Sequence, residues 1–271
     1  MTRKVDHEDT EKKIAYVREH GNHSSPARLR NMVMEVLGLP RPKASAEVAI
    51  HCGCYALFTG HTRLVSIYAR ILERLGVDFS FLDTEYCCGS ALVQSARGED
   101  RMRAKEASKE FLRLNMDIAR RKGAEKMAYF CSSCARIAKS MVGHETLSHT
   151  YLLDVLLDHL GDRRLGVTPV TVGYFEGCHS FIDAFYSGAV LPWKRYRRFL
   201  DRIDGLKVVD LPADTCCRGR SREILRRASQ MDLSIVLCSC NNCVRNLEKA
   251  LEDGMRVIHI VELINEALAR T

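Results

Sequence analysis

The cysteines of this sequence follow an order that occurs twice. Each half contains a Gly-Cys pair, then two adjacent cysteines, then a Cys-x-x-Cys motif. Agreement of this kind between two halves indicates an internal duplication. The first cysteine set is Cys54, Cys87, Cys88, Cys131 and Cys134, and the second cysteine set is Cys178, Cys216, Cys217, Cys240 and Cys243.

Short apolar runs precede the cysteines in both halves and alternate with helical patterns. The runs lie at 48–50, 77–82 and 127–130 in the first half, and at 172–175, 206–211 and 234–237 in the second. Strands that alternate with helices predict a parallel sheet with right-handed crossovers. We therefore expect an α/β fold with two duplicated Rossmann-like domains, whose cysteines follow the carboxyl ends of the strands.

A helical extension is expected before the first domain. The pattern over 26–37 predicts an amphipathic helix, either packed on the body or used to dock a partner, and the charged residues before it are expected to be mobile. We place the extension at 1–45, the first domain at 46–165 and the second at 166–271.

Charge and hydropathy narrow the functional classes. The 41 basic and 34 acidic residues give a net charge of +7, but the basic residues are spread out, which disfavours a nucleic-acid partner. Only 194–198 forms a basic run, interpreted as a solvated helix face or as a docking site for an acidic redox partner. The polar start and the lack of a long apolar stretch predict a cytoplasmic protein without direct membrane insertion.

The cysteine placement predicts two sulfur-rich sites. The carboxyl ends of parallel strands share one edge of the sheet, so five sulfurs of each half would converge there. Structural zinc takes four ligands, and a thioredoxin-like site needs one Cys-x-x-Cys, so iron–sulfur chemistry is favoured over both. A dinucleotide site is disfavoured, because the sequence has no G-x-G-x-x-G motif.

The two halves differ around the adjacent cysteines. Neighbouring residues of an extended chain point to opposite sides, so a sharp turn is needed for both sulfurs to face one site. Gly89 allows this turn in the first half, whereas Arg218 stands before Gly219 in the second. The stretch from there to the Cys-x-x-Cys has 42 residues in the first half and 22 in the second, so the second half is expected to lack most of a helix.

The doubled motif, spanning about residues 46 to 268, resembles the tandem CCG-domain family. This family includes the catalytic subunit of heterodisulfide reductase and the cysteine-rich parts of lactate, glycolate and glycerol-3-phosphate oxidation systems. The resemblance implies that each set of five cysteines holds one noncubane 4Fe-4S cluster. In some relatives the N-terminal motif binds zinc instead. Arg218 breaks the strict motif, so the turn geometry of the second half departs from the family's.

The resemblance also implies an activity and partners. It points to an iron–sulfur oxidoreductase subunit that reduces a small disulfide, or reversibly oxidises thiols, within a multisubunit complex. Electrons would come from a ferredoxin-like iron–sulfur subunit, of the kind that heterodisulfide reductase contains, and from a flavin-containing or other electron-input subunit. Membrane association would then arise only through partners. Two alternatives stay open, a non-catalytic electron-transfer subunit and a CCG scaffold with zinc in the N-terminal motif.

Three further residues have two interpretations each. His179 follows Cys178 directly and could donate a hydrogen bond to a cluster sulfur or a proton to a leaving thiolate, or be a satisfied histidine at a strand end. Cys52 and Cys238 are either buried spectators or alternative ligands.

Overall fold

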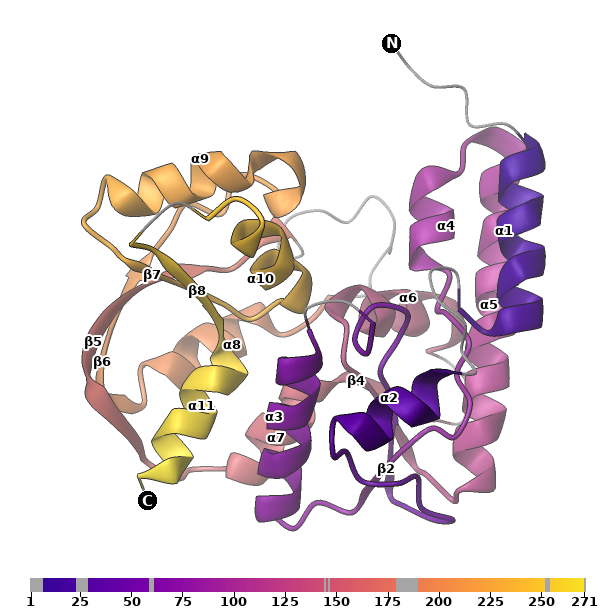
Figure 1. Ribbon diagram of the computed structural model, residues 1–271, viewed down its shortest axis with the longest axis horizontal. Helices are drawn as coiled ribbons and strands as arrows, with labels where there is room; N and C mark the ends of the chain where they lie inside the picture. Colours follow the sequence, from indigo (N-terminus) through magenta and orange to yellow (C-terminus); the bar gives the residue numbers. More distant parts are fainter. Residues whose placement is uncertain are drawn as a thin grey trace. The chain divides into compact units, whose positions relative to one another are not determined.

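Two parallel four-stranded sheets organise this protein (Figure 1). The computed structural model describes residues 7–22, 29–58, 61–143, 145, 147–178, 190–251 and 254–270. The described residues up to Val155 form one compact unit, and those from Leu156 onward form another. The expected α/β fold, with two duplicated halves and N-terminal helices, is confirmed.

The first sheet has the strand order β2-β1-β3-β4, and all its pairings are parallel. The elements of the first half are, in chain order, α1 (His7–His20), α2 (Arg30–Val36), β1 (Val48–His51), α3 (Thr62–Arg74), β2 (Phe79–Phe81), α4 (Ser90–Ser95), α5 (Gly98–Arg121), β3 (Lys126–Tyr129), α6 (Ser132–Val142), β4 (Ser148–Tyr151) and α7 (Leu152–Leu160).

The second sheet repeats this topology, with the strand order β6-β5-β7-β8 and parallel pairings throughout. Its elements are β5 (Leu165–Phe175), α8 (Trp193–Leu200), β6 (Ile203–Asp210), α9 (Cys217–Ser229), β7 (Ile235–Cys238), α10 (Asn241–Glu248), β8 (Arg256–His259) and α11 (Ile260–Ala269). Strands β5 to β8 thus correspond to β1 to β4.

Burial along the strands explains which ones the sequence reveals. All residues of β1 and β2 are buried, as expected for strands covered on both faces. The fourth strands, β4 and β8, lie at the sheet edges and alternate between exposed and buried positions. Their sequences are short and partly polar, so only three strands per half were expected where the structure has four.

The N-terminal residues differ from the expectation of a mobile segment. Helix α1 runs alongside α5 (Figure 1) and buries Ile14 and Val17. That prediction is wrong, because two apolar residues and cross-helix ion pairs hold a helix that is otherwise strongly polar. The helix expected over 26–37 is present as α2, and residues 23–28 lie outside the described part of the chain.

The shortened region of the second half is seen directly. The 24-residue helix α5 lies between the adjacent cysteines and β3, whereas the 13-residue α9 fills the corresponding stretch of the second half. Among the described residues, no helix has both the length and the apolar character needed to cross a bilayer.

Candidate metal centres

The first cysteine set gathers at the carboxyl ends of three neighbouring strands. Cys54 follows β1, Cys87 and Cys88 follow β2, and Cys131 and Cys134 follow β3. The Sγ atoms of Cys88 and Cys134 are 3.0 Å apart, although 46 residues separate them in sequence. Cys54 and Cys131 are partly exposed and the other three are buried. The strand order therefore brings these thiols together as the topology predicts.

The second cysteine set occupies the equivalent positions after β5, β6 and β7. The Sγ atoms of Cys178 and Cys216 are 3.3 Å apart. Cys178 and Cys216 are partly exposed, and Cys217, Cys240 and Cys243 are buried.

The thiols within each set influence one another's ionisation. The contact with Cys87, followed by burial, raises the pKa of Cys54 well above its usual value. Hydrogen bonding to Cys131 and Cys88, together with burial, does the same to the pKa of Cys134. Neighbouring thiolates in a buried site would repel one another, so they keep their protons.

The second set behaves in the same way. Contacts with Cys217 and Cys240, and then burial, raise the pKa of Cys243 well above its usual value. Contact with Cys216 and burial likewise raise the pKa of Cys178. A bound cation would remove this repulsion, because a coordinating thiol loses its proton to the metal. The donor chemistry of both sets fits a group with several positive centres and all-sulfur ligation.

A glycine precedes the first cysteine of each set for a steric reason. Gly53 and Gly177 both adopt positive φ, of 78° and 88°. A Cβ atom at Gly53 would lie 3.4 Å from Cys134 Sγ, and one at Gly177 would lie 3.0 Å from Cys243 Sγ. The Gly-Cys pair thus lets the backbone pass close to the second sulfur of Cys-x-x-Cys, which explains why this pair occurs in both halves.

Each Cys-x-x-Cys begins a helix. Cys131 is the N-cap of α6 and Cys240 is the N-cap of α10. The second cysteine of each motif, Cys134 or Cys243, lies in the first helical turn. Free N–H groups and the positive end of the helix dipole stabilise negative charge there, which suits thiolate ligands.

In the first set, helix α5 holds the turn that contains the adjacent cysteines. Gly89 has φ +73°, and a Cβ atom there would lie 2.7 Å from Ser108 Cβ of α5. Ser108 Oγ donates to the Cys88 carbonyl at 2.5 Å. Asn115 accepts from the Tyr86 N–H and donates to the Tyr86 carbonyl, both at 2.8 Å. Ser108 and Asn115 are completely buried, so α5 fixes this turn through two polar side chains.

A buried ion pair links the N-terminal extension to the first set. Arg30 of α2 donates to Glu85 at 2.8 Å and to the Leu82 carbonyl at 2.5 Å. Glu85 also accepts from the backbone N–H groups of Cys52 and Gly53, at 2.8 and 3.0 Å. One carboxylate thereby joins the loops after β1 and β2 to helix α2.

The chain between α1 and α2 closes over the same place. The Gly21 carbonyl accepts from the Cys87 N–H at 2.7 Å, and Asn22 donates to the Cys54 carbonyl at 3.2 Å. The cavity beside Cys54 and Cys87 has a volume of about 10 Å³, which is close to the space of one water molecule. The extension therefore covers the first set.

The second set is held by α9 and α10. Gly219 has φ +89° inside a kink of α9, one residue later than the turn at Gly89. Ser221 Oγ donates to the Cys217 carbonyl at 2.7 Å, which corresponds to the role of Ser108 in the first set. Asn246 Nδ2 donates to Cys217 Sγ at 3.3 Å. Contact with Cys216 raises the pKa of Cys217 to about 12, while hydrogen bonds from Cys243 and Asn246 act in the opposite direction.

The three remaining candidates lie in different environments. Cys52 is buried against Arg30 and Glu85, with its Sγ atom 3.9 Å from Arg30 Nη2. Cys238 is buried at the end of β7, where burial and then the charges of Cys240 and Cys217 raise its pKa. His179 lies outside the described residues.

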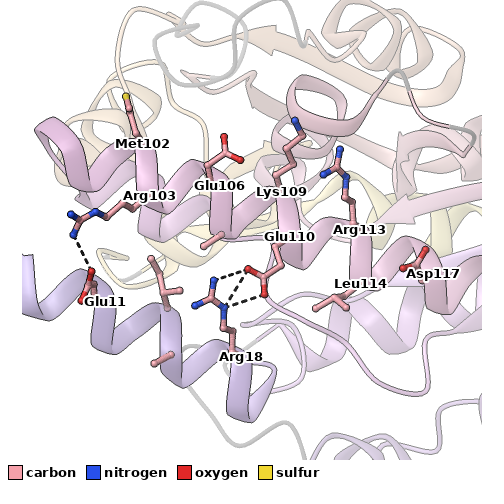
Figure 2. Close-up of a pocket in the computed structure, with 13 residues that line it drawn as sticks. Glu11, Arg18, Met102, Arg103, Glu106, Lys109, Glu110, Arg113, Leu114 and Asp117 are labelled. Carbon is pink, nitrogen blue, oxygen red and sulfur yellow. Dashed lines mark hydrogen bonds and ion pairs between the residues drawn. The ribbon is translucent and has the colours of Figure 1, made fainter.

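Charged surfaces elsewhere are separate from the cysteines. A groove of about 1010 Å³ runs between α1 and α5 (Figure 2), where Arg18 binds Glu110 at 2.7 Å and Arg103 binds Glu11 at 2.9 Å. None of the ten cysteines lines this groove.

The basic run at 194–198 is partly neutralised. Arg195 pairs with Asp158 at 2.5 Å, and Arg197 pairs with Asp210 at 2.6 Å and with Asp201. These pairs favour the interpretation of this run as a solvated helix face.

The described residues contain no group of three or more Cys, His, Asp and Glu side chains already arranged around a single ion. The convergence of each set therefore rests on the sulfur–sulfur distances and on the mutual effects of the thiols.

The contacts around both sets include residues that motif reading does not reveal. Arg30, Glu85, Ser108, Asn115 and Asn246 carry no recognisable local motif. Ser108 and Asn115 are seven residues apart on one helix, and polar residues on an otherwise apolar face are a signal that could have identified them.

Comparison with known proteins identifies relatives of this chain. Residues 48–137 match the family model of the CCG cysteine-rich domain. Curated relatives include a subunit of the dihydromethanophenazine:CoB–CoM heterodisulfide reductase of Methanosarcina barkeri, 27% identical over 257 residues, and its counterpart from Methanosarcina mazei, 28% identical over 255 residues. Each alignment covers 82% of this chain and 59% of the relative, so the chain spans about 59% of their length. Both relatives are subunits of a heterodisulfide reductase, the kind of complex to which the motif resemblance points.

Solved structures are more distant. A putative Asp/Glu racemase from Yersinia pestis aligns with 83% of this chain and 98% of its own, at 12% identity and a TM-score of 0.40. This similarity is too low to support an argument about function.

Proposed function

Because residues 48–137 match the CCG cysteine-rich domain and the chain is similar to a subunit of heterodisulfide reductase, we propose that it is an iron–sulfur subunit of an oxidoreductase complex of that kind. The observation that carries this proposal is the pair of equivalent five-cysteine sets, each internally coupled and each placed at three strand ends. We assign one noncubane 4Fe-4S cluster to each set. Zinc in the first set is the competing assignment.

The proposed reaction is the two-electron reduction of a small disulfide. The S–S bond breaks, two electrons and two protons enter, and two thiols leave; the reverse reaction oxidises the thiols. The clusters supply the electrons, and this chain's residues hold the cysteines and limit access of water. We propose a ferredoxin-like iron–sulfur subunit and a flavin-containing or other electron-input subunit as partners, in a cytoplasmic complex that meets a membrane only through them.

Metal analysis of the anaerobically purified full chain tests the cofactor assignment. Two four-iron clusters predict about eight irons per chain. Cys217→Ser and Cys88→Ser should each remove about half of the iron, whereas the matched control Cys52→Ser should retain it. Zinc with little iron would refute the proposal, and iron that survives both ligand substitutions would refute the assignment of these cysteines.

A spectroscopic experiment separates disulfide reduction from simple electron transfer. Addition of a small thiol under oxidising conditions should change the electron paramagnetic resonance spectrum if substrate sulfur reaches a cluster. An unchanged spectrum in protein with its full iron content would favour the non-catalytic electron-transfer role.

A further inference from the structure

The duplication allows the two cysteine sets to be compared position by position. Cys134 and Cys243 are equivalent, because each is the second cysteine of the motif that begins α6 or α10. Three residues further on, α6 has Ile137 and α10 has Asn246. Ile137 is completely buried and its side chain has no hydrogen-bond donor. Asn246 donates its Nδ2–H to Cys217 Sγ at 3.3 Å.

The hydrogen bond reaches a cysteine that belongs to the proposed ligand set. Cys217 is the second of the adjacent cysteines and is equivalent to Cys88 of the first set. It is buried, so a donor aimed at its sulfur acts with little screening by water. At the equivalent place of the first set, Ile137 can offer Cys88 only apolar contact.

The surroundings of the adjacent cysteines differ in the same direction. In the second set the Arg218 N–H donates to Cys216 Sγ at 3.4 Å, and the exposed side chains of Arg218 and Arg220 stand within three residues of Cys217. In the first set, the residues that follow Cys88 are Gly89, Ser90 and Ala91, which carry no charge.

Reduction of a cluster adds negative charge to its sulfur ligands. Hydrogen bonds to those sulfurs and nearby cations stabilise the reduced form, so they raise the reduction potential. Both differences between the sets therefore favour reduction of the second set over the first.

We propose that Asn246 is a positioning residue that, acting through Cys217, raises the reduction potential of the second cysteine set above that of the first. An electron shared by the two sets then resides at the second. This inference rests on the proposed function, because it requires a cluster in each set. Asn246 need not touch the substrate.

Reductive titration of the anaerobically purified full chain tests this inference. Dithionite is the reductant, and the electron paramagnetic resonance and visible spectra report the midpoint potential of each cluster. We expect two separate reduction steps, of which Cys217→Ser removes the one at higher potential. Asn246→Leu, similar in size but without a donor, should move that step to lower potential and leave the other step and the iron content unchanged.

Two further variants separate an electronic role from a structural one. Asn246→Asp, which keeps the size and loses the N–H, should lower the same step at least as far as leucine. The matched control Ile137→Leu should move neither step. If the leucine variant loses iron, the aspartate variant still provides the measurement.

The possible outcomes are distinct. An unchanged potential in either Asn246 variant with full iron would overturn this inference and leave the proposed function standing. Assignment of the higher-potential step to the first set would also overturn it. Wild-type protein without iron would overturn both proposals, and that result is obtained before any titration.

Discussion

Breaking the buried ion pair between Arg30 and Glu85 should destabilise the first half strongly. Their side chains are only 4% and 7% exposed, and their N···O distance is 2.8 Å. In Arg30→Met the Glu85 carboxylate keeps the backbone N–H groups of Cys52 and Gly53 but loses its cation. Removal of one partner of a buried pair costs about 3–5 kcal/mol. Because two hydrogen bonds to the carboxylate remain, we expect a loss near the lower limit, about 3 kcal/mol.

Urea unfolding followed by circular dichroism measures this loss. The control is Arg18→Met, which breaks the exposed pair with Glu110 and should cost less than about 1 kcal/mol. The double variant Arg30→Met/Glu85→Gln leaves no unpaired charge and should be more stable than Arg30→Met alone. A loss below about 1 kcal/mol for Arg30→Met, or no recovery in the double variant, would refute the reasoning.

Three other substitutions give separate expectations. Gly89→Ala combines positive φ with a Cβ contact of 2.7 Å and should cost about 3 kcal/mol in urea unfolding, whereas Gly219→Ala, in open space, should cost about 1 kcal/mol; equal losses would contradict this. Burial lowers the pKa of His149 from 6.5 to about 4, so the free energy of unfolding should fall by up to about 3 kcal/mol as the pH falls from 6.5 to 4. His149→Gln should flatten that profile, and a profile unchanged by it would exclude this histidine as the cause. Asn115→Leu removes both bonds to the Tyr86 backbone and should cost about 2 kcal/mol, with iron lost from the first set only; retention of all iron would show that the turn does not depend on it.

The sequence predicts those elements that have a strong local signal. Apolar runs identify the central strands, because these are buried on both faces. The edge strand β4 reads Ser148-His-Thr-Tyr151, and its alternating exposure leaves no such run. Helix α1 was missed for a similar reason, since Ile14 and Val17 are too few to form a recognisable apolar stripe.

The contacts that hold the first cysteine set depend on the tertiary fold. Arg30 and Glu85 are 55 residues apart, and neither lies in a pattern that would pair them. The match between Ser108 and the Cys88 carbonyl likewise appears only when α5 is placed against the turn. The positions of the cysteines follow from strand order, whereas the residues that support them follow from packing, which a single sequence does not encode in any local window.

The two halves share the placement of their cysteines but differ in how the adjacent cysteines are supported. A serine hydroxyl satisfies the carbonyl of the second adjacent cysteine in each half, yet Ser108 comes from the separate helix α5, while Ser221 comes from the same helix as Cys217. The loss of α5 in the second half is therefore compensated locally. It also removes the element that imposes a glycine at the turn, since Gly219 has open space where Gly89 faces Ser108. The arginine within the second motif is tolerated for that reason, and it places positive charge beside the second set where the first has none.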